Sequence, residues 1–387
     1  MQAIRLLIIG LFVGLLRAIS IRNYRTRVKQ WLTQYHDKRA LRGLHAANGH
    51  VNARLRQLGY RKKDIRWNLL YSLVSRRQSA DFIPESLYYF QIEPRLNTLP
   101  MRLAYGDKNM YDRWYAGIPG VRLPVTVLRN INGFLYDRKY ELIGMQAAED
   151  LLGDGKYIIK PSLDSGGGKN VHILEAARER ANAGTAVRST LWGADRVGRL
   201  EDIARHYGKD YIVQEYIQQH KYFARLCPTS VNTMRVMTYR SVGDDQVHVI
   251  QRIMKIGRVG RVTDNEWTGS VTVGISETGT LNRYAVNKFG VRHTEFNGLD
   301  IASLPANPFV SAVDRAARAI ASQVYYSRLV GMDFAVDEDG AAVFIEMNHS
   351  YNGINFFQYN NGPLFQNYTD EILEYCARQR RDHYVYY

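Results

Sequence analysis

The chain contains very few cysteines, and this scarcity excludes several kinds of protein. Among 387 residues only Cys227 and Cys376 are cysteines, too few for a disulfide framework. No CxxC or HExxH pattern occurs, so the sequence gives no indication of a zinc site. We therefore expect a globular protein of a reducing compartment, with a cytoplasmic location as the default.

The N-terminal segment lacks a long hydrophobic run and contains few acidic residues. Its apolar run, Leu6 to Leu16, would reach about 16 Å as a helix. The hydrocarbon core of a membrane is about 30 Å thick, so this run is too short to span it. Residues 1–66 hold 15 Lys and Arg but two acids, whereas the remainder holds 37 basic and 35 acidic residues. This pattern predicts attachment to an anionic membrane surface, on its cytoplasmic face. The alternative is a buried N-terminal helix. The nearly neutral remainder does not indicate a nucleic-acid partner.

The stretch Leu329 to Asn348 predicts a hairpin of two strands. Asp339-Gly340 is a strong signal for a two-residue turn, because both positions favour positive φ. Counting outward from that turn, we expect Phe334 to face Ile345 and Asp333 to face Glu346.

This register predicts a metal site on one face of the hairpin. Asp333 and Glu346 would lie side by side, with Asn348 two residues further along on the same face. Facing carboxylates repel each other, and burial without a partner is costly. A Mg²⁺ ion bound by these oxygen atoms removes the conflict. The alternative is that the carboxylates lie on a solvated face.

A second candidate site lies between two predicted strands within residues 157–174. Lys160 ends the first strand, and the glycines Gly166, Gly167 and Gly168 precede Lys169. Glycine runs let backbone N–H groups approach a phosphate, and lysines supply charge to it. The alternative is a plain turn between strands. The pattern is neither a P-loop nor a dinucleotide-binding fingerprint, because a strand and not a helix follows it.

Taken in order, these pieces resemble the ATP-grasp superfamily, and more closely its sugar-transfer-associated family, some members of which are called hexapeptide transferases. The residues that carry the resemblance are Asp107-Lys108, Lys160, Gly166 to Lys169, Gln214 to Ile217, Asn232 to Arg235, and Asp333, Glu346 and Asn348. The resemblance implies an α+β fold in which two subdomains clasp ATP. We expect a helical N-terminal segment over residues 1–45, a subdomain over 46–150, a lid over 151–217 and a catalytic subdomain over 218–387.

The resemblance also implies a role for each matching residue. Lys108 and Lys160 would contact the α- and β-phosphates, Ser165 to Lys169 would fold over the triphosphate, and Arg235 would face the γ-phosphate. The implied adenine hinge is Gln214, Glu215, Tyr216 and Ile217, Asn232 is a further nucleotide-binding candidate, and Asp333, Glu346 and Asn348 would hold Mg²⁺. The hinge departs from many relatives, which have Glu where this chain has Gln214, and the ribose contact is unassigned.

The implied reaction transfers the γ-phosphoryl group of ATP to a substrate carboxylate, and an amine or another nucleophile then displaces phosphate. Lys160 and Arg235 are catalytic candidates, and Arg252, Arg258 and Asn265 are candidates for binding the carboxylate or the intermediate. The carboxylate substrate could be an acidic sugar, an amino acid or a peptide, in cell-surface polysaccharide assembly with glycosyltransferase partners. Two alternatives remain: a phosphotransferase, for which His349 beside the metal pattern is notable, and a scaffold that binds nucleotide without turnover.

Overall fold

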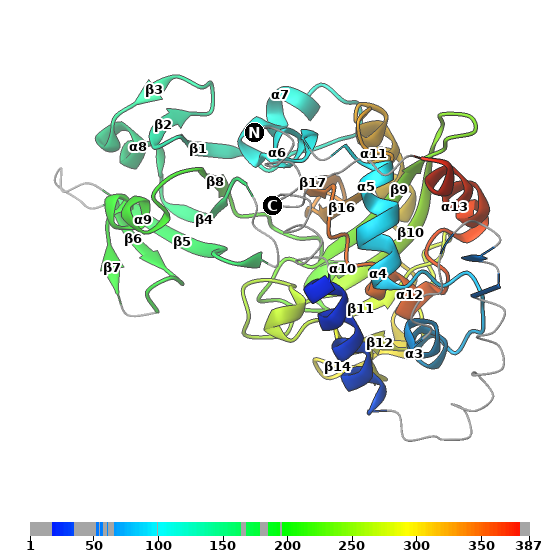
Figure 1. Cartoon of the computed structure of the whole chain (residues 1–387). Helices are drawn as coiled ribbons and strands as arrows, with labels where there is room; N and C mark the ends of the chain where they lie inside the picture. The colour runs from blue at the N-terminus through cyan, green and yellow to red at the C-terminus, as the bar shows by residue number, and fades with distance from the viewer. Residues whose placement is uncertain are drawn as a thin grey trace, which may run out of the picture.

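The computed structural model of the chain describes most of its length. The described residues are 18–34, 52–53, 55–56, 60, 66–98, 100–163, 168–178, 185–193 and 196–379. The apolar run from Leu6 to Leu16 and the loop residues Ser165, Gly166 and Gly167 lie outside these ranges. The described chain is built on two large antiparallel sheets, which lie on the left and right of Figure 1.

The first sheet, which we term the lid sheet, has eight strands. In spatial order they are β3 (Leu142–Ile143), β2 (Phe134–Asp137), β1 (Thr126–Ile131), β8 (Tyr211–Glu215), β4 (Gly155–Pro161), β5 (His172–Arg178), β6 (Thr185–Ser189) and β7 (Val197–Gly198). Helices α8 (Met145–Leu151) and α9 (Leu200–Tyr207) pack on it, around apolar residues such as Ile159 and Val213. The expected boundary at residue 150 cuts this sheet, because β1 pairs with β8, from residues far along the chain.

The second sheet forms the body of the protein and has seven strands. In spatial order they are β13 (Arg292–His293), β12 (Ala285–Val286), β11 (Val271–Gly274), β10 (Val247–Ile256), β9 (Thr233–Arg240), β16 (Leu329–Val336) and β17 (Ala342–Asn348). Side chains alternate between its two faces. Val236 and Met254 pack in one cluster with α11 (Val310–Ser322), while Met237 and Ile253 pack in another with α12 (Ile354–Asn361).

Helices and short elements surround the body sheet. Before the lid sheet come α3 (Arg66–Ser75), α4 (Glu85–Leu87), the π-helix η1 (Tyr88–Ile92), α5 (Glu93–Leu96), α6 (Met101–Gly106), η2 (Lys108–Met110) and α7 (Tyr111–Tyr115). Later come α10 (Lys221–Ala224), η4 (Glu266–Thr268), β14 (Glu295–Phe296), β15 (Leu299–Asp300), η5 (Ile301–Ser303), η6 (Gln366–Tyr368) and α13 (Thr369–Arg378). The described part of the expected 46–150 subdomain therefore divides in two: its helices pack on the body, and its strands belong to the lid sheet.

A helix over residues 18–32, dark blue in Figure 1, lies against the body. Val28 is fully buried, Trp31 packs edge-on against Trp67, and Arg27 forms an ion pair with Glu85 at 3.4 Å. Its other side leaves residues such as Arg25 exposed. Part of the basic N-terminal segment is thus a packed helix. No helix of the described residues combines the length and the apolar character needed to cross a membrane.

The hairpin β16–β17 confirms the facing pair Asp333 and Glu346 but corrects the expected register near the turn. Phe334 faces Phe344, not Ile345, because the turn has three residues: the Asp337 N–H donates to the Ala341 carbonyl. A bulge between Asp333 and Phe334 then shifts the register by one residue and restores the expected pair. A classic bulge sets two residues of one strand against one of the other. The longer turn and the bulge therefore offset each other, and Asp333 faces Glu346 as expected.

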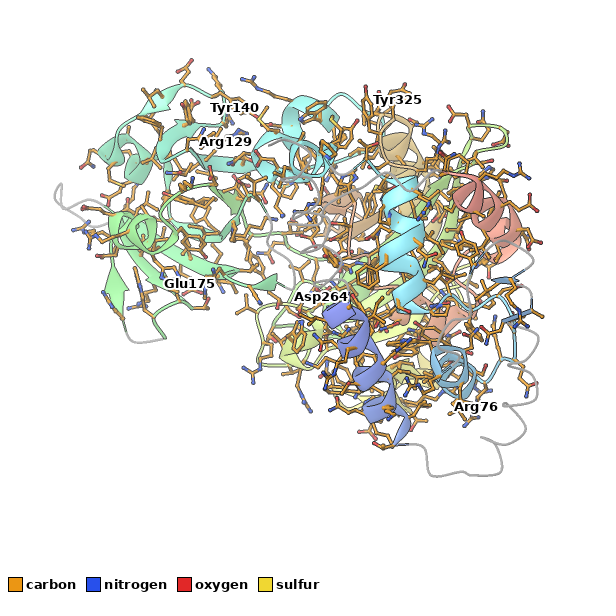
Figure 2. The ribbon with its side chains drawn as sticks, in the orientation of Figure 1. Arg76, Arg129, Tyr140, Glu175, Asp264 and Tyr325 are labelled. Atoms are coloured by element: carbon orange, nitrogen blue, oxygen red, sulfur yellow. The ribbon has the colours of Figure 1, made fainter. Side chains whose placement is uncertain are left out.

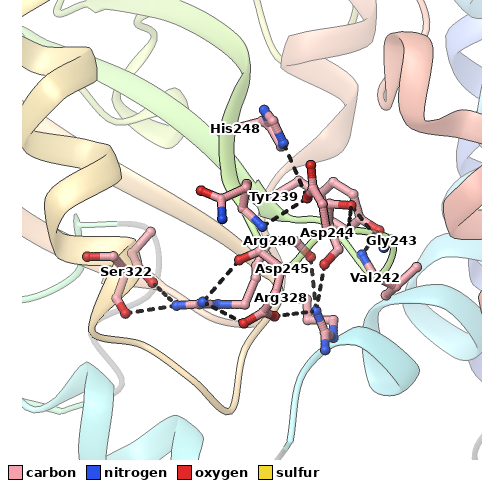
Figure 3. Close-up of polar contacts among 12 residues, drawn as sticks. Tyr239, Arg240, Val242, Gly243, Asp244, Asp245, His248, Ser322 and Arg328 are labelled. Atoms are coloured by element: carbon pink, nitrogen blue, oxygen red, sulfur yellow. Dashed lines mark hydrogen bonds and ion pairs between the residues drawn. The ribbon is translucent and has the colours of Figure 1, made fainter.

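The far end of the body sheet is fixed by a polar cluster around the β9–β10 turn (Figure 3). The Arg240 guanidinium donates to the Asp245 carboxylate at 3.3 Å and to the Ser322 carbonyl at 2.8 Å, which ties the turn to the end of α11. Arg328, just before β16, also donates to Asp245. These contacts hold β9, β10 and β16 in register at the end remote from Asp333.

Candidate active site

Asp333 lies at the centre of a charged cluster on the body sheet. Arg235 on β9 binds it with two hydrogen bonds of 2.6 Å, and the Lys255 ammonium on β10 lies 3.2 Å from its Oδ2. The three strands are adjacent, and Arg235 is the direct partner of Asp333 across β9 and β16. Burial alone would raise the pKa of Asp333, but the two cations hold it well below its usual range. Asp333 is therefore a fixed negative charge.

Glu346 and Asn348 lie beside Asp333, as the hairpin pattern predicts. Glu346 is about a quarter exposed, and its two oxygens lie 3.7 Å from Arg235 Nη2 and from Lys108 Nζ. The Asn348 amide group carries a buried Nδ2 without a hydrogen-bond partner among the described residues. The N and O positions of an amide are assigned from hydrogen bonds, and the opposite assignment presents an oxygen at this place. Two carboxylates and an unsatisfied amide suit a hard cation such as Mg²⁺.

Two lysines from separate parts of the chain approach Glu346. Lys160, next to the last residue of β4, is almost completely buried, and so is Lys108 at the start of η2. Burial lowers the pKa of Lys160 from 10.5 to about 7, and the neighbouring charge of Lys108 acts in the same direction, while Glu346 opposes it. Two lysines that repel each other at the end of a cleft favour an anionic ligand.

The segment that carries Lys108 connects the lid sheet to the body. Asn109 Nδ2 donates to the Asn130 carbonyl of β1 at 2.9 Å, and Met347 N of β17 donates to Tyr111 Oη at 3.0 Å. The Asp112 carboxylate accepts hydrogen bonds from Arg129 and Tyr140, which are labelled together in Figure 2. Arg129 is fully buried and lies over the Tyr140 ring. These contacts fix Lys108 relative to both sheets.

A cavity of about 140 Å³ lies between the two sheets and opens onto this charged cluster. Its lining includes all four expected hinge residues, Gln214, Glu215, Tyr216 and Ile217. Its apolar part is formed by Pro124, Ile158, Val171, Val231, Val262 and Ile345. Among the described residues, the backbone N–H of Ile217 has no hydrogen-bond partner, although Tyr216 N donates to Lys156. A flat apolar ligand with a hydrogen-bond acceptor fits this end of the cavity.

The glycine loop reaches the body at its described end. Gly168 lines the cavity with φ of +64°, and a Cβ at this position would lie 3.3 Å from Asn265 Cβ. Asn265 also lines the cavity, and its Oδ1 accepts from Trp267 N at 2.9 Å. Lys169 is exposed. The loop therefore contacts the Asn265 loop of the other sheet at a position where only glycine fits without strain.

Several expected residues within the described ranges do not line the cavity: Lys108, Lys169, Asn232, Arg235, Arg252, Arg258 and Asn348. Two of them, Arg252 and Asn232, have partners elsewhere in the fold. Arg252 lies on the opposite face of β10, where Asp314 of α11 binds its guanidinium at 2.6 to 3.0 Å. Asn232 is fully buried, and its amide binds Gln219, two carbonyls and Gly257 N. These hydrogen bonds of the Asn232 side chain hold the backbone segment that precedes β9 in place. Both residues therefore support the sheet, and we leave them out of the proposed site.

Three residues of the site were missed by reasoning from the sequence. Lys255 and Asp264 form an ion pair at 3.2 Å, and Asp264 Oδ2 also accepts from Thr233 N. Ile345 lines the cavity beside Glu346. Lys255 interrupts an apolar strand, which is a visible signal, but the face it occupies depends on a register that the sequence does not reveal. The position of Ile345 could be predicted only if the bulge between Asp333 and Phe334 were known.

His349 follows the metal pattern but lies outside the cavity. It is stacked on Tyr105 at 5.2 Å and its Nδ1 lies 3.0 Å from Ser327 Oγ. Burial lowers the pKa of His349 to about 3. A buried neutral imidazole packed in this way is not available to accept a phosphoryl group.

The chain matches one protein family and is distantly similar to several solved structures. The family model described as sugar-transfer associated ATP-grasp matches residues 91–373. Among solved structures, the biotin carboxylase domain of 2-oxoglutarate carboxylase from Hydrogenobacter thermophilus is similar at 15% identity and TM-score 0.37, covering 73% of this chain and 47% of that one. The VanG D-Ala:D-Ser ligase from Enterococcus faecalis is similar at 14% identity and a TM-score of 0.36, and the match covers 70% of this chain and 60% of that one. Biotin carboxylase from Campylobacter jejuni is similar at 13% identity and a TM-score of 0.41, and the match covers 71% of this chain and 47% of that one.

This chain thus spans about half of the length of the solved structures that it matches. Comparison with curated proteins gives no match.

Proposed function

Because this chain belongs to the sugar-transfer-associated ATP-grasp family, we propose that it is an ATP-dependent ligase that activates a substrate carboxylate and couples it to an amine. The observation that carries the proposal is the meeting of opposite charges at one end of the cavity. Four cations surround the carboxylates Asp264, Asp333 and Glu346: Lys160 from the lid sheet, Arg235 and Lys255 from the body sheet, and Lys108 from η2. Such a cluster suits a phosphate chain accompanied by a metal ion.

We place the adenine of ATP against the apolar wall of the cavity. The backbone N–H of Ile217, which has no partner among the described residues, would donate a hydrogen bond to the adenine ring. The side chain of Gln214, on β8, would form hydrogen bonds with the edge of the ring. The triphosphate would then run towards Lys108 and Lys160. The glycine loop, of which Gly168 contacts the opposite wall, would cover it. Backbone N–H groups of such a loop and lysine charges bind phosphate well.

Asp333, Glu346 and Asn348 would hold Mg²⁺ in this arrangement. When bound, the metal neutralises charge on the phosphates and orients them. Arg235 and Lys255 already neutralise Asp333, so these side chains are rigid before any ligand arrives. Preorganised donors of this kind stabilise charge that develops in a transition state.

Phosphoryl transfer in this site would use the substrate carboxylate as nucleophile. A carboxylate oxygen forms a bond to the γ-phosphorus, the bond from phosphorus to the bridging oxygen breaks, and ADP leaves with that electron pair. Arg235 and Lys255 would stabilise the γ-phosphoryl charge, because Lys255 and Glu346 both line the cavity and Arg235 Nη2 lies 3.7 Å from the Glu346 carboxylate. Asn265 is the residue that we propose for contact with the acyl phosphate. No protein nucleophile is needed.

The biological setting that we propose is the assembly of a glycan. The description of the family links it to sugar transfer, so we propose a role in glycan or cell-surface polysaccharide assembly, with glycosyltransferases as partners. We further propose peripheral attachment to the cytoplasmic face of a membrane through Leu6 to Leu16 and the basic residues after it. Exposed Arg22, Arg25 and Lys29 on the helix over residues 18–32 are consistent with this.

The two alternatives are less well supported. A phosphotransferase that uses His349 requires an exposed imidazole, whereas His349 is buried. A scaffold without turnover has no need of carboxylates packed against four cations, since such clusters are costly to bury. A phosphotransferase that acts on a sugar hydroxyl stays open to test.

The decisive experiment measures both half-reactions. The enzyme, ATP and Mg²⁺ are incubated with a panel of uronic acids, amino acids and dipeptides, and hydroxylamine is added to trap any acyl phosphate as a hydroxamate. We expect ADP release and hydroxamate formation to require the same carboxylate. ADP release with a neutral sugar and no hydroxamate would refute the ligase and indicate a sugar kinase.

A further inference from the structure

Three side chains form an exposed aromatic patch on the body, which we term the Trp267 patch: Trp267, Lys288 and Phe289. Trp267 is 69% exposed and Phe289 is 42% exposed. The Lys288 ammonium lies 3.5 Å from the centre of the Trp267 ring and 5.0 Å from that of Phe289. Single exposed apolar residues are ordinary, whereas a contiguous group of them marks an interaction surface. This surface is apolar and carries a positive charge at its centre.

The Trp267 patch adjoins the wall of the ATP cavity. Trp267 belongs to η4, and its backbone N–H donates to Asn265 Oδ1 at 2.9 Å. Asn265 lines the cavity, and Gly168 of the glycine loop packs against it. A partner that binds the Trp267 ring therefore lies two residues along the chain from the cavity wall.

The Trp267 patch also adjoins the helix over residues 18–32. The ring of Phe289 meets the ring of Trp31 edge-on, with 6.3 Å between the ring centres. Trp31 lies on the face of the helix that packs on the body, because it also contacts Trp67. The patch and the helix are therefore continuous, and the patch connects the helix to the cavity.

The charge of this helix is of one sign. Its exposed face presents Arg22, Arg25 and Lys29 at helical spacing, and no acidic residue occurs between positions 18 and 34. The apolar run Leu6 to Leu16 ends directly before the helix begins. Basic side chains beside exposed aromatic rings suit the interface of an anionic bilayer, where cations meet lipid phosphates and the rings lie at the level of the headgroups.

We propose that the Trp267 patch and the exposed face of the helix form one docking surface for an anionic lipid bilayer, and that the substrate carboxylate is carried by a lipid of that bilayer. The attachment proposed above anchors the chain by its N-terminus, whereas this surface determines which side of the body meets the lipid. With Trp267 among the headgroups, the Asn265 wall of the cavity lies next to the bilayer, and an acidic headgroup reaches it from the membrane. The lipid-borne substrate rests on the proposed ligase function, but the docking surface does not.

The first test measures docking without turnover. Full-length protein is mixed with vesicles of equimolar phosphatidylcholine and phosphatidylserine whose acyl chains carry bromine near the headgroup, and indole fluorescence is recorded. Bromine quenches nearby indoles, so the difference between wild type and Trp267→Phe isolates the signal of Trp267. We expect this signal to be quenched more strongly by these vesicles than by brominated phosphatidylcholine alone. An unquenched Trp267 signal, or equal quenching by the neutral vesicles, refutes the docking surface.

The affinity of full-length variants for the same vesicles provides a matched comparison. Lys288→Gln should weaken binding by about fivefold, the usual contribution of one basic residue near an anionic surface. Trp267→Ala should weaken it by about tenfold or more, because the indole would lose its apolar contact with lipid. Tyr325→Ala is the control. Tyr325, labelled in Figure 2, is 66% exposed and also lies against a cation, Arg240, but at the far end of the body sheet. Equal effects of Trp267→Ala and Tyr325→Ala would overturn the docking surface.

The substrate class is tested by presenting each acid in two forms, free and on a lipid. Glucuronosyl diacylglycerol represents the uronic acids and phosphatidylserine the amino acids, and ADP release and hydroxamate formation are measured on vesicles. We expect a higher kcat/KM for the lipid-borne form, and we expect Trp267→Ala to lower the rate with that form but not with the free acid. Equal kcat/KM for both forms overturns the lipid-borne substrate. If neither form of any acid gives hydroxamate, the ligase function and the lipid-borne substrate fail together, and the quenching alone decides the docking surface.

Discussion

Nucleotide binding should be accompanied by proton uptake at one residue, Lys160. The side chain is 7% exposed and its pKa falls from 10.5 to about 7, first because of burial and second because of Lys108. A triphosphate placed against Lys160 would favour its charged form again. Above about pH 7, binding must therefore draw a proton from solvent.

The size of this effect follows from the shifted pKa. At about pH 8, a group with a pKa of about 7 is roughly 90% neutral, so restoring its charge takes up about 0.9 proton per bound ligand. The depressed pKa also corresponds to a free-energy cost of roughly 5 kcal/mol for the charged form in the folded protein. Because the folded pKa lies below the unfolded value, this cost is complete below about pH 7 and is relieved as the pH rises towards 10.5.

Isothermal titration calorimetry measures proton uptake directly. A non-hydrolysable ATP analogue with Mg²⁺ is titrated into the protein in buffers of different ionisation enthalpy, and the slope gives the number of protons. Lys160→Arg is the matched control, because arginine keeps its charge at every accessible pH. We expect the wild type to take up about 0.9 proton more than Lys160→Arg. Equal uptake by both proteins would show that Lys160 does not face the phosphates. Lys160→Ala should also weaken binding far more than Lys169→Ala, since Lys169 is exposed.

Four further outcomes are expected. Glu346→Gln should remove most of the Mg²⁺-dependent rise in melting temperature and the turnover, and a wild-type rate would refute the metal assignment. Gly168→Ala should lower turnover, because positive φ costs about 1–2 kcal/mol and the new methyl group meets the opposite loop, whereas Gly193→Ala, also at positive φ but in open space, should not. Asp112→Asn should lower the melting temperature and raise the KM for ATP, because it leaves a buried arginine unpaired at a cost of about 3 kcal/mol or more. Deletion of residues 1–17, which spares the packed helix, should reduce flotation with anionic vesicles but preserve the ATP-dependent melting shift.

The carboxylate pair was predictable from the sequence because local rules determine it. Asp333 and Glu346 flank a short turn, and the period of two along each strand limits which residues can share a face. The expected turn length was nevertheless wrong by one residue, and the prediction holds because the bulge after Asp333 compensates. The Asn132-Gly133 turn between β1 and β2 follows the same local rule, with φ of +53° and +93°. Features of this kind depend on a few neighbouring residues.

The residues that sequence reasoning misplaced depend instead on pairing between distant segments. Arg252 and Lys255 are three residues apart on one regular strand, so they must point to opposite faces. Which of them faces the cavity is decided by the pairing of Lys255 with Thr233 and by the packing of α11 on the other face. The expected domain boundary at residue 150 falls within the lid sheet for the same reason, because β1 pairs with β8, more than 80 residues later.

The charged cluster has an internal consequence for how nucleotide and metal would bind. In the described structure Arg235 and Lys255 saturate Asp333 with hydrogen bonds, so Asp333 is not free to serve a metal ion at full strength. A phosphate chain that engaged Arg235 and Lys255 would weaken their hold on Asp333, and a metal bound by Asp333 would release the two cations towards the phosphates. Each ligand would therefore favour the binding of the other, and linkage would make that effect reciprocal. A buried charge cluster of this kind is costly as a structural element, but it suits a site whose ligands arrive as an ion pair.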